Sequence, residues 1–161
     1  MASQATSRRR TRQGGQEIIE FTFLLVPVLG FLFLTIDIAW MVFTRATLQH
    51  AVREGARYAV VNGPAYLSNP TGETTVVKDR VKQFAFGLLT GKDDQILVTW
   101  YTQQPNATTG QYEYVIATGT GANNSGNLVE VSVEGYSAKS LLGVFHDLTP
   151  FVFAARSADR M

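Results

Sequence analysis

A glutamate at the mouth of a long apolar segment is the residue of this chain that packing explains least well. Glu20 is followed by Phe21 and then by apolar sequence as far as Thr44, in which Asp37 is the only formal charge. A helix over this stretch spans roughly 36 Å at about 1.5 Å per residue, enough to cross a hydrocarbon core of about 30 Å. A carboxylate is costly in such a place, so Glu20 indicates a function.

Further charged residues on the same predicted helix are candidates for docking to a partner. Asp37 has two interpretations: it pairs with a neighbouring helix, or it is an interfacial residue if the membrane ends near Ile36. The other candidates follow the apolar segment, where spacings of three and four would also let charges on a solvated helix pair locally. They are Arg53, Glu54, Arg57 and Tyr58.

Residues typical of catalytic sites are sparse and isolated. The chain has no cysteine, so no thiolate can act as nucleophile or metal ligand. His50 and His146 lack metal-ligand spacing, and Asp93-Asp94 is interpreted as a turn pair. Gly119-Thr120-Gly121 does not stand between a strand and a helix, as a phosphate loop requires. We therefore predict no catalytic residue, no metal, no cofactor and no enzymatic activity.

The distribution of charge favours a membrane anchor and gives its orientation. The leader carries Arg8, Arg9, Arg10 and Arg12 and no acid, so the positive-inside rule places it in the cytoplasm and the C-terminal part outside. Residues 62–161 hold seven basic and nine acidic residues. Nucleic-acid binding would need a basic patch, so no nucleic-acid partner is expected.

The apolar segment is too long for a cleaved secretory signal, whose apolar region has about 7–15 residues. It continues without a small-x-small break into a stretch of helical periodicity that ends at Asn62-Gly63-Pro64. One helix from Glu17 to Val61 is predicted, bent at Pro27. Its first half would lie in lipid and its second half, residues 45–61, would be amphipathic.

The rest of the chain predicts a small α+β domain. After a loop over 62–72, a second helix has Val77, Val81, Phe84, Ala85 and Leu88 on one face and stops near Thr90-Gly91. Alternating apolar residues then predict three or four antiparallel strands. Their ranges are 95–103, 111–118, 128–134 and 151–156. We expect this sheet to pack on residues 45–61 of the first helix, with the strands contributing Val129, Val131, Phe151 and Phe153.

The N-terminal third of the chain resembles the TadE-like family, minor pilin-like proteins of tight-adherence (Flp) pilus systems. The resemblance rests on Gly15-Gln16-Glu17-Ile18-Ile19-Glu20-Phe21, on Ile36-Asp37-Ile38, and on the run from Leu48 to Ala59 that contains Arg53-Glu54-Gly55-Ala56-Arg57-Tyr58. It covers residues 14–60. Glu17 departs from the family pattern, which usually has a small residue there.

The resemblance implies a processed subunit. A prepilin peptidase would cut between Gly15 and Gln16, leaving a new α-amino group on Gln16 and Glu20 at the fifth position of the mature chain. The acid of one subunit would meet the amine of its neighbour, with Phe21 beside it, because opposite charges near a membrane are less costly when paired. The implied partners are the bilayer, the peptidase, other pilin-like subunits and the assembly machinery.

The expected organisation is therefore a cytoplasmic leader (1–15), a transmembrane helix (16–44) and an extracytoplasmic α+β domain (45–161), anchored by a single span in a bacterial inner membrane. Two functions fit it. One is a pilin-like structural or assembly subunit, in the pilus or remaining in the membrane. The other is an uncleaved, single-span receptor or adhesin whose outer domain binds a partner. They differ at Gly15 and Glu20, which only the first requires.

Overall fold

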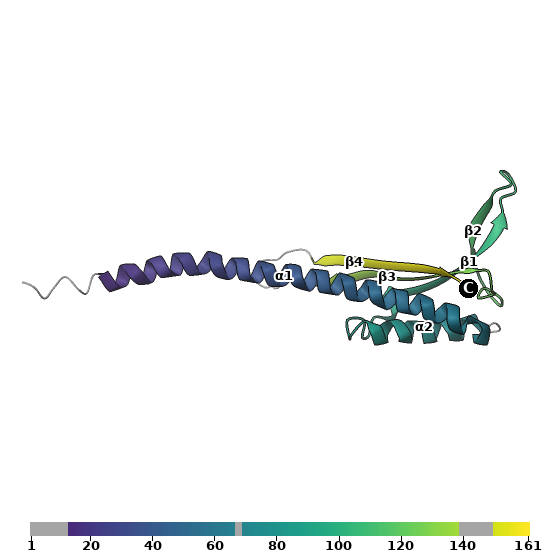
Figure 1. The fold of residues 1–161 in the computed structure, drawn as a ribbon, viewed down its shortest axis with the longest axis horizontal. Coiled ribbons are helices and arrows are strands. Elements are labelled where there is room, and N and C mark those ends of the chain that lie inside the picture. The colour runs from purple at the N-terminus through teal and green to yellow at the C-terminus, as the bar shows by residue number, and fades with distance from the viewer. Residues whose placement is uncertain (1–12, 67–68, 139–149) are drawn as a thin grey trace, which may run out of the picture.

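The other elements of the fold are arranged along a single long helix. The structure is a computed structural model and describes residues 13–66, 69–138 and 150–161. Helix α1 (Gln13–Asn62) has 50 residues and contains Pro27, so it is about 75 Å long at about 1.5 Å per residue. Its first half extends alone from the domain, and the other elements gather along its second half (Figure 1). The predicted continuous helix is confirmed, with an earlier start that places Gly15 inside it.

The C-terminal end of α1 leads through a short turn into the second helix. A 3-10 turn, η1 (Gly63–Tyr66), follows α1 and precedes α2 (Pro70–Phe84). Asn69 caps α2, since its side-chain oxygen accepts a hydrogen bond from the backbone N–H of Gly72 at 2.9 Å, and proline suits the first helical turn. The loop predicted over 62–72 therefore ends earlier than expected, because α2 already begins at Pro70.

Helix α2 also ends earlier than the sequence predicts. Phe86 and Gly87 both have positive φ angles, of 48° and 84°, and such left-handed residues terminate a helix. The chain reaches Thr90 through turns instead, but Leu89 in those turns is still buried. The apolar periodicity past Phe84 therefore reflects burial of a turn rather than more helix.

Four antiparallel strands form the sheet, in the order β2-β1-β3-β4. After a 3-10 turn, η2 (Asp93–Gln95), they are β1 (Ile96–Pro105), β2 (Tyr112–Ala117), β3 (Leu128–Ala138) and β4 (Phe151–Arg160). The last two are longer than predicted. The outer part of the β1–β2 hairpin projects away from the body (Figure 1), and this accounts for the exposure of most of β2.

The second half of α1 packs against β3 and β4 and against α2, and α2 in turn contacts β1, so the two helices lie side by side along the sheet (Figure 1). Small residues make this possible: a Cβ built at Gly55 would clash with Cγ2 of Val81, and Ala51, Ala56 and Ala59 are buried. The expected packing of the sheet on this half of α1 is confirmed. Its partners include Val129 and Val131, which are fully buried.

Phe151 was predicted in this core, and that prediction is wrong. It stands at the first position of β4 and is 42% exposed, although Ala138, its partner on β3, is buried. Phe153, two residues further, is partly buried and packs on the core cluster. The α+β class, the two helices and the antiparallel sheet are otherwise as the sequence predicts.

Candidate processing and assembly surface

The predicted processing site lies in regular, exposed helix. Helix α1 runs through Gly15 and Gln16 without a break, and a Cβ built at Gly15 would meet no atom within 4 Å. The amide Nε2 of Gln16 donates a hydrogen bond of 3.1 Å to the Oε1 of Glu20, one turn later. The two residues that processing and assembly would use therefore lie on the same side of the helix.

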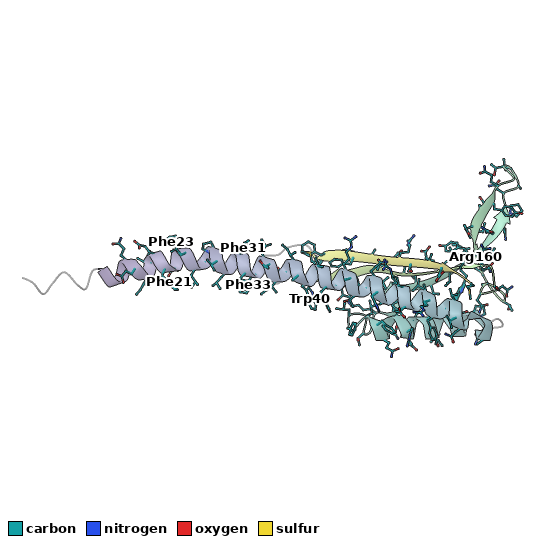
Figure 2. The ribbon with its side chains drawn as sticks, in the orientation of Figure 1. Phe21, Phe23, Phe31, Phe33, Trp40 and Arg160 are labelled. Carbon is teal, nitrogen blue, oxygen red and sulfur yellow. The ribbon has the colours of Figure 1, made fainter. Side chains whose placement is uncertain are left out.

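Glu20 is exposed, with the polar residues Gln16 and Glu17 one turn before it and apolar Phe23 and Leu24 one turn after it. Within the part of the chain that the structure describes, no salt bridge involves Glu17 or Glu20. Phe21 beside Glu20 is exposed as well, and Figure 2 shows Phe21, Phe23 and Phe31 projecting from α1 far from the domain. A neutral amide contact leaves the negative charge of Glu20 uncompensated, so a cation from another molecule would stabilise it.

An apolar surface with a shallow groove surrounds this position. The groove has a volume of about 410 Å³ and is lined by Ile18, Ile19, Thr22, Phe23, Val26 and Pro27. All residues from 17 to 32 are exposed, over about 24 Å of helix. A helix long and apolar enough to cross a membrane is found once among the described residues, and this stretch belongs to it.

Asp37 differs from its neighbours. Its side chain is only 5% exposed, whereas Ile36 and Ile38 are exposed. It belongs to the side of α1 that the chain itself covers, which begins at the partly buried Phe33 and continues through Thr44 and Leu48. In this conformation the Asp37 side chain is therefore not presented to a partner in the way that Glu20 is.

The segment from Arg53 to Ala59 divides into two faces with different roles. Gly55, Ala56 and Ala59 face the core, whereas Arg53 and Arg57 are exposed and Glu54 and Tyr58 are partly buried. No salt bridge joins Arg53, Glu54 or Arg57 to any described residue. The local pairing that their spacing allows is not formed, so these charges remain available to a partner.

Helix α2 adds a third arginine to this outer face. The Arg80 guanidinium lies 5.6 Å from the ring centroid of Tyr58 and 4.5 Å from that of Phe84, and Arg80 Nη1 donates to Gln83 Oε1 at 2.8 Å. A groove of about 300 Å³ lies there. Its lining comprises Glu54, Arg57, Tyr58, Val61, Asn62 and Arg80. We call these six residues the docking groove, which is positively charged with one acid.

The residues that the sequence analysis set aside for catalysis have ordinary surroundings. The His50 ring packs on Phe84 with centroids 5.7 Å apart, while His146 lies outside the described residues. Asp93 forms an ion pair of 2.8 Å with Lys82, and Gly119 and Gly121 belong to turns with positive φ. No group of three potential metal ligands occurs among the residues described.

Comparison with known families identifies the N-terminal segment. Residues 15–57 match the family model described as TadE-like protein. This segment is TadE-like. The match begins at the glycine of the predicted processing site and ends within the docking groove, so the TadE-like segment contains every one of the predicted site residues except Tyr58, which follows it directly. No curated protein and no solved structure matches the chain.

Two features outside the TadE-like segment were not singled out from the sequence. One is Arg80, which brings α2 into the docking groove. The other is Glu73, whose Oε2 accepts a 2.6 Å hydrogen bond from Nδ2 of Asn123. Glu73 precedes Val77 and Val81 by four and eight residues, so the helical period already placed it on the buried face of α2. The apolar period of α2 is therefore the sequence signal that indicates burial of Glu73.

Proposed function

We propose that this TadE-like, pilin-like protein is a structural or assembly subunit of a tight-adherence pilus system, cut by a prepilin peptidase between Gly15 and Gln16. Two observations support this proposal. A TadE-like match starts at Gly15, and the Glu20 carboxylate is exposed on an apolar helix where, among the described residues, its hydrogen-bond partner is the amide of Gln16. The function is non-enzymatic, with α1 anchored in a bacterial inner membrane and the domain outside.

Cleavage would change the electrostatics of this turn of helix. Removal of the leader gives Gln16 a charged α-amino group, one turn from the Glu20 carboxylate. In a single subunit both charges face lipid, where desolvation is costly. Side by side, the amine of one subunit meets the carboxylate of the next, and each compensates the other. Glu20 would thereby set the axial register of neighbouring helices, with Phe21 and the apolar groove as packing surface.

The docking groove would serve the same assembly on the extracytoplasmic side. It offers Arg57 and Arg80, which have no salt-bridge partner among the described residues, where α1 and α2 pack together. A partner that presents a carboxylate there would find two guanidinium groups, which are suited to bidentate binding. Other subunits and the assembly machinery are the proposed partners, with Arg53, Glu54 and Tyr58 bordering the contact.

A strain carrying Glu20→Gln tests the assembly role, with Glu17→Gln as the matched control. Both changes remove one exposed acid from the same turn region, but only Glu20 has the predicted amine as its partner. We expect Glu20→Gln to insert and be processed normally while surface piliation falls, and Glu17→Gln to retain piliation. Arg57→Glu in the same assay should also reduce piliation without loss of folded protein.

Normal piliation with wild-type amounts of processed protein in the Glu20→Gln strain would contradict the proposal. It would favour the alternative of an uncleaved, single-span receptor or adhesin, which needs neither Glu20 nor cleavage. Blocking cleavage through a bulky residue at Gly15 should produce the same defect as Glu20→Gln. Because both changes remove one interaction, the two defects should not add.

A further inference from the structure

The start of β4 exposes two large apolar side chains that the domain core does not use. Phe151 is 42% exposed and Val152 is 68% exposed. Successive strand residues point to opposite faces, so the start of β4 presents apolar surface on both faces of the sheet, although Ala138 opposite Phe151 is buried. We call these two residues the β4 entry. Exposure alone does not assign a role, since Tyr112 on the distant hairpin is 75% exposed.

The β4 entry differs from that hairpin in its position along the axis of α1, which we call its height. Strand β4 runs beside α1 (Figure 1), and Nε2 of Gln49 donates a 3.1 Å hydrogen bond to the backbone oxygen of Arg156. At the other end of the strand, Met161 packs against Gly63, so the two elements run in the same direction. Phe151 precedes Arg156 by five residues, about 16 Å at about 3.3 Å per residue.

The same distance of about 16 Å corresponds to about eleven residues of helix, which places the β4 entry roughly level with Ile38. At this height the exposed side chains of α1 are apolar, namely Ile36, Ile38, Trp40 and Phe43. The acid at this level, Asp37, is buried, and the next charged residue is Arg45. The Trp40 and Phe43 rings lie 5.6 Å apart. Tryptophan is enriched where a helix leaves the hydrocarbon for the headgroups.

We propose that Phe151 and Val152 insert into the interface of the same bilayer that α1 crosses, so that the domain rests on the membrane on its β4 side. This inference uses only the membrane anchor of the proposed function. Residues 17–32 of α1 are all exposed and span about 24 Å, and six more residues, about 9 Å, reach the level of Ile38. The sum of about 33 Å is close to the roughly 30 Å of a hydrocarbon core. The outer boundary of the hydrocarbon then falls beside the β4 entry, and exposed Phe and Val side chains lose their contact with water there.

Single cysteines test this contact in the full-length chain, because the sequence has no cysteine of its own. Val152→Cys is labelled with an environment-sensitive fluorophore and reconstituted into vesicles of phosphatidylcholine and phosphatidylglycerol. Tyr112→Cys is the control for an exposed residue far from the membrane, and Phe31→Cys is the control for the anchor. Phe151→Cys repeats the test on the other face of β4.

We expect the Val152 label to emit at shorter wavelength than the Tyr112 label and to be quenched by lipids with a spin label near the headgroup. Its quenching by aqueous iodide should be several-fold weaker than that of the Tyr112 label. Equal iodide quenching at the two positions, with the Phe31 label still quenched by lipid, would overturn the inference alone. Protection from iodide without lipid quenching would also overturn it, by indicating a protein contact. Loss of lipid quenching at Phe31 would overturn the membrane anchor itself.

Discussion

Glu73 is a carboxyl group buried in the folded domain, where its charged form is costly. It is 1% exposed, and its Oε1 has no hydrogen-bond partner in the described part of the chain, although its Oε2 accepts from Asn123. Burial raises the pKa of this carboxyl above its ordinary value of 4.5, and the Asn123 hydrogen bond lowers it by a smaller amount. A buried carboxyl is more stable protonated than charged.

The raised pKa of Glu73 makes the stability of the domain depend on pH. The folded state binds the proton more tightly than the unfolded chain does. The contribution is fully present below the unfolded pKa of about 4.5 and is lost as the pH rises through the higher folded pKa. A tenfold difference in proton affinity between the folded and unfolded states corresponds to about 1.4 kcal/mol of stability.

Glu73→Gln should therefore stabilise the full-length protein in detergent at pH 7, and the difference from wild type should vanish below about pH 4.5. The amide keeps an acceptor for Asn123 and has no charge to desolvate. Thermal unfolding at pH 4 and pH 7 measures this, with the exposed Asp94→Asn as control. A lower melting temperature for Glu73→Gln at pH 7 would mean that the charged carboxylate has a stabilising partner.

At the scale of elements, the packing of α1 against α2 gives a structural reason for the small residues in the Arg53–Ala59 segment. Gly55 is required because Val81 of α2 occupies the space where its Cβ would be. Arg53 and Arg57 on either side point outward and take no part in the core. The periodicity of apolar residues predicted that this half of α1 is buried on one side. It did not predict that a second helix would approach so closely, because that depends on tertiary contacts.

Gly55→Ala should destabilise the full-length protein in detergent by about 1–3 kcal/mol, because overpacking outweighs the roughly 0.5–1 kcal/mol that replacement of a helical glycine normally gains. Gly30→Ala is the control, since a Cβ there meets no atom within 4 Å. Adding Val81→Ala makes room and should recover part of the loss, so the two changes should couple in a double-mutant cycle. Equal melting temperatures for Gly55→Ala and wild type would contradict the tight α1–α2 contact.

Element boundaries show what the sequence could and could not predict. The alternation in Leu128–Glu134 and the helical period around Val77 and Val81 predicted the right elements, because each has one buried face. The predicted end of α2 was wrong because Ala85 and Leu88 pack on the core from turns and so continue the apolar pattern of the helix. The prediction for Phe151 was wrong because alternation tells which face of a strand a side chain is on, but not how completely the neighbouring elements cover it.

At the scale of the whole molecule, the sequence predicts correctly that the chain has an apolar helical part and a separate domain with its own core. The exposed apolar half of α1 and the buried core of the domain share one continuous helix, and Glu20 and the docking groove lie at opposite ends of the TadE-like segment. The spacing of Gly15 and Glu20 could be found from the sequence. The joining of Arg80 to Arg57 and Tyr58 could not, because it depends on how α2 folds back along α1.

Cleavage at Gly15 is the central claim, and the intact mass of the protein recovered from its native membrane tests it most directly. Removal of residues 1–15 from the 161-residue chain leaves 146 residues that begin with Gln16. We expect the mass of this shorter chain, and the full-length mass when Gly15 is replaced by a bulky residue. A native protein with the mass of all 161 residues would contradict the account.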